Sequence, residues 1–473
     1  MSHAGDRAPA TSLTLLDATM VGIGAMIGAG IFVLTGLATD GVGPGAIVVF
    51  ALNGGVTTFT ALSYAELAAA IPRNGGGYAY VREVFSAPVS FVMGWTRWFT
   101  YMIAGALYAL GFASNFVELF HLYDLTLPGP PVAYALVAVV AFVALNALST
   151  AASGSAETVV TLVKIGILLV FVVFGMQFVD LGEFRPLFPN GPLSVLPAMG
   201  LTFIAFQGYD LIATVTEEVE DPQKNIPRAI LLSVVVTVVV YLLVVFVAIG
   251  TLGAEGLGDA GETAIAEAAT GFMPVFPILG TGAALIAFGA VFSTISALNA
   301  VVIGSSRVAF AMGRERQLPA RLGHLHHRYG TPFVAIVASA AVMLVAVLVV
   351  PIRIVGNLAS LFSLLGFVLV NLCVIRLRHQ QPDLRRPFEI PYYPIPPVLG
   401  IVCNLLLGLF IDPYTWLLAL AWLSLGIGVY LALSRRGVAA GVEEVQADIE
   451  ERAPEIAEPE QDVSLPPVED QQE

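Results

Sequence analysis

The sequence predicts an all-α polytopic membrane protein with about twelve transmembrane helices. Three observations support this: 57% of the 473 residues are hydrophobic, only 12% are charged, and apolar runs long enough to cross a bilayer recur along the chain. An ordinary soluble domain has a very different composition. The expected spans are residues 13–38, 44–71, 88–119, 131–149, 156–180, 193–216, 229–251, 276–311, 332–350, 354–377, 396–411 and 413–434.

The distribution of positive charge indicates how these spans are oriented. If the N-terminus is cytoplasmic, most of the 21 Lys and Arg residues fall in cytoplasmic segments, whereas Arg185 and Arg353 fall outside. This asymmetry follows the positive-inside rule. We therefore expect an integral protein of the cell membrane with both termini in the cytoplasm.

The first span contains four glycines in the stretch 22–30, which reads Gly-Ile-Gly-Ala-Met-Ile-Gly-Ala-Gly. Glycine lowers helix stability, and unwound backbone at membrane depth is tolerated only where it is buried in protein or lines a cavity. We expect a helix broken here, with its free peptide groups facing a ligand. A packing face built on Gly24 and Gly28 is the alternative. A phosphate loop is disfavoured because no Gly-Lys-Ser/Thr follows.

The sixth span places Gln207, Gly208 and Asp210 near its centre. If the first ten spans form two halves of five, spans one and six occupy corresponding positions, where broken helices indicate the binding site of a secondary transporter. Free N–H groups at a half-helix N-terminus suit a carboxylate, and freed carbonyls suit an ammonium. An α-amino acid carries both groups. We expect Asp210 to cap the second half-helix; contact with the amine of the ligand is the alternative.

Lys164 lies deep in the fifth span, where a lysine is costly and suggests a function. It could exchange a proton, or supply a fixed positive charge in place of a bound cation. The alternative is a structural cation that caps carbonyls. Glu66, Glu157 and Arg97 are expected near the membrane interface in structural roles. The acidic 217–228 segment is expected to be a cytoplasmic loop that either pairs with the basic residues 307–328 as an inner gate or is simply solvated.

The chain shows little that suggests a metal site or an enzyme. Cys373 and Cys403 lie in apolar segments and are expected to be small core residues rather than a disulfide. The serine motif at 153–155 has no His or paired acid with it in the membrane. We expect no metal, no cofactor and no catalytic residue. The basic-loop histidines are expected to be solvated; they are His324, His326 and His327.

Several motifs resemble those of amino acid–polyamine–organocation (APC) transporters, especially their cationic amino acid transporter-like branch. Residues 22–36, ending Gly-Ile-Phe-Val-Leu-Thr-Gly, resemble the first span of that family. Residues 203–210, Phe-Ile-Ala-Phe-Gln-Gly-Tyr-Asp, and the following 217–228 resemble the sixth span and its loop. Residues 306–319 resemble the end of the eighth span, and 74–78 the loop after the second. The resemblance covers roughly residues 13–435.

The resemblance implies a five-plus-five inverted repeat of leucine-transporter type, with spans one and six broken. The implied units are a cytoplasmic N-terminus (1–12), two five-helix repeats (13–182 and 193–378), two additional helices (396–434) and an acidic tail (437–473). The tail is rich in Glu, Pro and Gln and is expected to be disordered, either as a solubilising segment or as one that binds a partner.

The resemblance also implies which residues hold the substrate. They are Ile27, Gly28, Ala29, Gly30, Ile31, Phe203, Ala205, Phe206, Gln207 and Gly208, with Phe203 or Phe206 as an aromatic gate. Lys164 falls where proton-dependent relatives place a lysine at the second sodium position. Thr100 stands where some relatives of the cationic branch carry an acid, which argues against cationic substrates and leaves neutral ones open.

Together these observations predict a secondary active transporter of amino acids that works by alternating access, as a proton-coupled symporter or an exchanger. The expected partners are an amino acid, a proton, and the lipid bilayer. Sodium is not expected to be required, and no nucleic acid is expected. A transporter of polyamines or other organic amines is one alternative, although such a cargo would favour more acidic side chains in the site. A membrane sensor that binds an amino acid without moving it is another.

Overall fold

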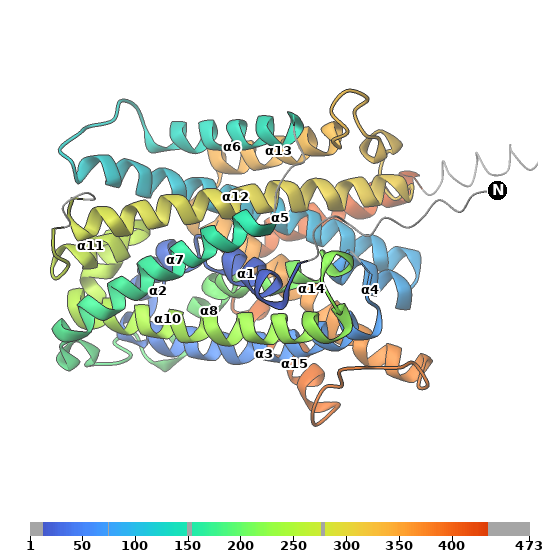
Figure 1. Cartoon of the computed structure of the whole chain (residues 1–473), viewed down its shortest axis with the longest axis horizontal. Coiled ribbons are helices and arrows are strands. Elements are labelled where there is room, and N and C mark those ends of the chain that lie inside the picture. Colours follow the sequence, from blue (N-terminus) through green and yellow to red (C-terminus); the bar gives the residue numbers. More distant parts are fainter. Residues whose placement is uncertain (1–12, 74, 149–153, 276–279, 434–473) are drawn as a thin grey trace, which may run out of the picture.

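The computed structural model describes residues 13–73, 75–148, 154–275 and 280–433, and its regular structure there is helical apart from one isolated bridge between Leu13 and Val219. The all-α prediction is therefore confirmed for these ranges (Figure 1). The helices are α1 Leu15–Met26, α2 Gly30–Val42, α3 Ala46–Ala70, α4 Gly76–Val84, α5 Ala87–His121, α6 Pro131–Leu148, α7 Gly154–Gly175, α8 Val195–Thr202, α9 Tyr209–Ile212, α10 Pro222–Ala260, α11 Ala264–Thr270, α12 Gly282–Arg314, α13 Phe333–Val349, α14 Ile352–Gln380 and α15 Ile395–Leu409. A last helical segment, Pro413–Leu433, follows them.

The described ranges contain nine segments long and apolar enough to cross a membrane, and α13 and α15 are shorter apolar helices. The first segment, Leu15–Ala70, includes both of the first two predicted spans. The chain is thus a polytopic membrane protein. The number of twelve crossings and the inverted repeat remain predictions.

The two segments that were expected to be broken lie at the centre of the bundle. In Leu15–Ala70 and in Pro192–Ile212, 83% of the most apolar window is buried inside the protein. The corresponding share is 22% in α6 and 11% in Pro413–Leu433. Figure 1 shows α1, α2 and α8 between an outer layer containing α6 and α13 and an opposite layer containing α3 and α15. The helices that present apolar side chains outward therefore surround the helices that are interrupted.

Three helical segments differ from the sequence prediction. The short α4 and α11 fall between the predicted spans, where apolar runs of membrane length give no signal. The 217–228 segment is not a loop throughout, because α10 begins at Pro222. Proline suits the first position of a helix, where its missing N–H is not needed. α10 also extends past the predicted residue 251, across a non-helical Gly253 with φ 78°.

Other expectations concern single residues and the ends of the chain. Cys373 and Cys403 are both free thiols; Cys373 is buried, as expected of a small core residue, whereas Cys403 is only partly buried. Asn74, Ser153 and the terminal segments 1–12 and 437–473 lie outside the described residues, as do the side chains of Ser155 and Glu157.

Candidate functional site

The first span is interrupted between α1 and α2, as predicted. α1 ends at Met26, where the N–H of Ile27 donates to the carbonyl of Ile23 at 2.8 Å, and α2 begins at Gly30. The residue before α2, Ala29, offers no side-chain hydrogen bond to the new helix. A helix N-terminus without a side-chain cap presents N–H groups and partial positive charge to its surroundings.

The sixth span is interrupted by a tighter structure. α8 ends at Thr202, a 3₁₀ turn covers Phe203–Phe206, and α9 begins at Tyr209. Between them Gly208 has φ 144°, a conformation that residues with side chains rarely adopt. The predicted second break is therefore confirmed, and glycine is required at its turning point.

The two breaks lie against each other. A Cβ added to Gly208 would come within 2.6 Å of the backbone N of Met26, and one added to Gly30 within 2.6 Å of the Cβ of Ala205. The hydroxyl of Tyr241 lies 2.5 Å from the carbonyl oxygen of Met26 and 3.0 Å from that of Ala205. This tyrosine of α10 thus joins one carbonyl from each break.

Other freed carbonyls of the first break are held by α7 and α12. The Ser293 hydroxyl donates to the carbonyl of Ile27 and lies 3.1 Å from that of Gly28. The fully buried Lys164 donates through Nζ to the Gly24 carbonyl and to the Ser296 hydroxyl, each at 3.1 Å. Lys164 therefore links α7 to α1 and α12 beside the break.

A cavity of about 540 Å³ leads away from the breaks. Near the breaks it is lined by Gly24, Ala25, Arg97, Tyr101 and Asp210. Towards its other end it is lined by Leu13, Tyr78, Glu218, Arg307 and Ala311, which lie on the side predicted to be cytoplasmic.

A smaller hollow of about 20 Å³ adjoins the inner end of this cavity and shares Ala25, Tyr101 and Ala297 with it. Of the predicted binding residues, Gln207 and Gly208 line this hollow, and the Gln207 side-chain oxygen accepts a hydrogen bond from Ser363 at 2.7 Å. The others are buried within the breaks and line neither space; they are Ile27, Gly28, Ala29, Gly30, Ile31, Phe203, Ala205 and Phe206.

Arg97 was expected at the membrane interface, and the structure corrects this. Its side chain is 5% exposed and forms an ion pair with Asp210, whose side chain is 1% exposed. The same guanidinium donates to the Tyr101 hydroxyl at 2.9 Å. Asp210 also accepts from the backbone N–H of Gly208 at 3.0 Å, but it lies inside α9, whose N-terminus has no side-chain cap, so the expected capping of the second half-helix is not confirmed. The pair therefore ties the second break to α5.

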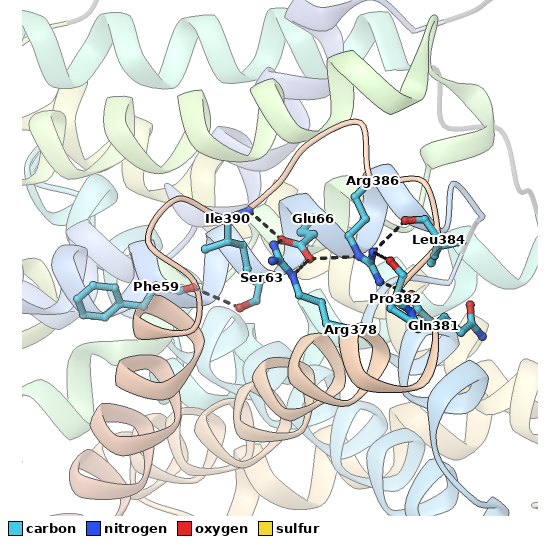
Figure 2. A network of polar contacts seen from close by, with 9 residues as sticks. All are labelled: Phe59, Ser63, Glu66, Arg378, Gln381, Pro382, Leu384, Arg386 and Ile390. Atoms are coloured by element: carbon cyan, nitrogen blue, oxygen red, sulfur yellow. Dashed lines mark hydrogen bonds and ion pairs between the residues drawn. The ribbon is translucent and has the colours of Figure 1, made fainter.

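Glu66 has the structural role that the sequence suggested. Figure 2 shows Arg378 of α14 forming two hydrogen bonds with its carboxylate, at 2.7 and 2.6 Å. The backbone N–H of Ile390 donates to it at 2.8 Å, and Arg386 lies 3.8 Å away. Glu66 thus fastens the segment between α14 and α15 to α3, at a distance from the cavity lining.

A possible inner gate between 217–228 and 307–328 stays a prediction. Glu315, just after α12, pairs with Arg82 of α4 and accepts from the Tyr78 hydroxyl at 2.8 Å. Glu218 and Arg307 line the same cavity from its two sides.

The sequence did not identify Tyr241, Ser293 or Ser296 as parts of this region. A single hydroxyl in an apolar helix gives no signal of its own, because Ser and Thr in helices commonly bond to their own backbone. The described residues also contain no group of three or more His, Cys, Asp or Glu that could hold a metal ion.

Comparison with known proteins places the chain among transporters. A family model for amino acid permeases matches residues 13–424. The branched-chain amino acid permease BcaP of Bacillus subtilis is 30% identical over 447 residues, which cover 91% of this chain and 95% of that protein. The methylthioribose transporter of B. subtilis is 29% identical, covering 90% and 94%, and its serine/threonine exchanger SteT is 28% identical, covering 84% and 90%. The chain therefore belongs to the amino acid permease family of the APC superfamily and is a transporter, not an enzyme.

Proposed function

We propose that this protein moves neutral L-amino acids across the cell membrane by alternating access, with the substrate backbone held between the two breaks. The observation that carries this proposal is the contact between two interrupted helices at the inner end of the large cavity. The N-terminus of α2 lacks a side-chain cap and suits the substrate carboxylate. The carbonyls freed at the breaks already accept one hydrogen bond each, and their second lone pair suits the ammonium group.

The surroundings of the small hollow support a neutral side chain. Its lining is mostly apolar and includes Ala104, Tyr108, Ala297, Ala300 and Val301. Among the described residues that line the cavity close to the breaks, the acid is Asp210, which is already paired with Arg97. Relatives named for branched-chain amino acids and for serine and threonine agree with a neutral cargo. A methylthioribose transporter among them means that family membership alone does not name the cargo.

We assign cation coupling to Lys164. Its ammonium contacts α1 and α12 beside the first break, so a change in its charge would alter how α1 is held. Loss of the proton would weaken its bond to the Gly24 carbonyl and so favour movement of α1. This links proton transfer to the arrangement of the helices that hold the substrate.

The structure corresponds to an inward-facing state in this proposal. The cavity extends to the side predicted to be cytoplasmic. On the other side of the breaks, Phe50, Phe206 and Tyr241 pack with ring centroids 5.3 to 5.9 Å apart. Farther out, Arg353 of α14 pairs with Asp40 of α2 at 2.5 Å.

The experiment that tests this function is uptake of labelled amino acids into proteoliposomes, with and without an inward proton gradient and with and without internal amino acid. Protein-free liposomes provide the background. Gradient-driven accumulation of aliphatic neutral amino acids is the expected result for a symporter, and uptake only into preloaded vesicles identifies an exchanger. Absence of uptake for every amino acid, with protein that remains folded, would contradict the proposal.

A further inference from the structure

A second large hollow lies on the outside of the bundle, where α12 ends and α13 begins. It has a volume of about 620 Å³ and is separate from the cavity at the breaks. We call it the α12–α13 hollow, and its polar lining consists of Arg314, His324, His326 and His327. None of the described residues that line it is acidic. The hollow therefore favours an anionic group.

Two polar groups of the hollow, His326 and Arg314, lie against neighbouring aromatic rings. The ring of His326 stacks on Tyr329 and lies against Phe333, with centroids 4.9 and 5.6 Å apart. Its Nδ1 accepts from the backbone N–H of Arg328 at 3.3 Å, so the neutral ring carries its proton on Nε2 and remains a donor. The guanidinium of Arg314 lies over the Phe310 ring, 5.9 Å from its centroid. Donors fixed in this way lose little freedom when they bind a ligand.

The apolar surface next to the hollow identifies the kind of ligand. Phe333 and Val334 line the hollow and are 40% and 43% exposed. From there an exposed apolar stripe runs along α13 at helical spacing, through Val337, Val345 and Leu348. α13 lies in the outer layer of the bundle (Figure 1). A soluble phosphate would use the cationic end of this surface but not the stripe.

We propose that the α12–α13 hollow binds the headgroup of an anionic phospholipid, whose hydrocarbon chain lies along the exposed stripe of α13. Arg314 and the Nε2–H of His326 donate to the phosphate. Basic pockets beside transmembrane helices on the cytoplasmic side suit such headgroups, and the hollow lies on the side where the basic 307–328 residues were predicted. The bound lipid would hold the connection between α12 and α13.

The test is native mass spectrometry of the full-length protein released from detergent, with added phosphatidylglycerol or phosphatidylcholine of identical chains. The wild type should retain phosphatidylglycerol preferentially. One Arg near a membrane surface contributes about 1 kcal/mol, so Arg314→Gln should reduce this preference about five-fold. Adding His326→Gln should reduce it further. Arg185→Gln, which removes a charge that is also exposed but lies in another loop, should leave the preference unchanged.

Two further measurements separate a lipid site from a soluble-anion site. Phosphatidylglycerol with six-carbon chains should be retained less than the long-chain lipid, and excess glycerol phosphate should not displace the latter. If glycerol phosphate displaced the lipid, the hollow would be a site for a soluble anion, and the proposal would be overturned. Equal retention of the two headgroups by the wild type, or unchanged preference in the folded Arg314→Gln variant, would also overturn it.

Discussion

The buried pair of Arg97 and Asp210 gives the sharpest prediction about stability. Removing one member of a buried ion pair leaves the other charge without its partner, at a cost of about 3–5 kcal/mol. We expect Asp210→Leu and Arg97→Met each to lower the free energy of unfolding by about this amount. Both side chains are at most 5% exposed, so solvent would compensate little for the lost partner.

In the double variant the loss of unfolding free energy should be smaller than the sum of the losses in the two single variants. Replacing a whole buried ion pair by apolar residues of similar size is often neutral or stabilising. Arg97→Met/Asp210→Leu should therefore be more stable than either single variant. It should still transport poorly, because Asp210 also accepts from the N–H of Gly208 at the second break.

The measurement is unfolding of the purified protein in mixed micelles for the wild type, both single variants and the double variant. The control is the pair of Asp40 and Arg353, whose side chains are 58% and 43% exposed. Exposed pairs contribute about 0–1 kcal/mol, so the corresponding substitutions should have little effect. If the costs at Arg97 and Asp210 simply added, or were as small as those of the control pair, the structural reasoning would be refuted.

Three further predictions concern the breaks, the coupling residue and the partly buried carboxylate of Asp412. Gly208→Ala should abolish transport and destabilise the fold by about 1–3 kcal/mol, because φ is 144° and the new Cβ would lie 2.6 Å from the backbone N of Met26. Gly55 has open space around it, so Gly55→Ala should be tolerated in the same uptake and unfolding assays. Lys164→Ala should remove the pH dependence of transport from a protein that remains folded; an unchanged pH profile would exclude the coupling role. Burial raises the pKa of Asp412, but hydrogen bonds, chiefly from Thr415, outweigh this and hold the pKa below its usual value. The ionised Asp412 carboxylate therefore contributes fully to stability above about pH 4, and this contribution is lost at lower pH. The difference in unfolding free energy between wild type and Asp412→Asn should shrink on acidification. A difference that stayed constant with pH would contradict this.

The broken helices could be predicted because their signal is local. Glycines at 22–30 and at 208 stand inside apolar runs, and the physical cost of glycine in a membrane helix applies wherever the rest of the chain lies. The order of the long helices along the chain could be predicted for the same reason, because each long apolar run is a local signal. The short helices α4 and α11 could not be found in this way, since they are neither long nor continuously apolar.

The contacts that organise the site come from positions far apart in the sequence. Tyr241 bonds to Met26, and Arg97 pairs with Asp210, across more than a hundred residues in each case. Arg97 was misplaced because its depth was judged only from its own span, without knowledge of the acid that faces it. The sequence pattern identifies where backbone is freed, whereas only the folded arrangement shows which hydroxyl or charge meets it.

In the proposed site one amino acid is held by both its carboxylate and its ammonium between the two breaks. The most direct measurement is competition against uptake of the best labelled neutral amino acid in proteoliposomes, using its decarboxylated amine and its deaminated acid. The unlabelled amino acid should inhibit uptake strongly, and neither analogue should do so at the same concentration. Inhibition by the amine as strong as that by the amino acid would contradict the claim, because the carboxylate would then have no role at the α2 N-terminus.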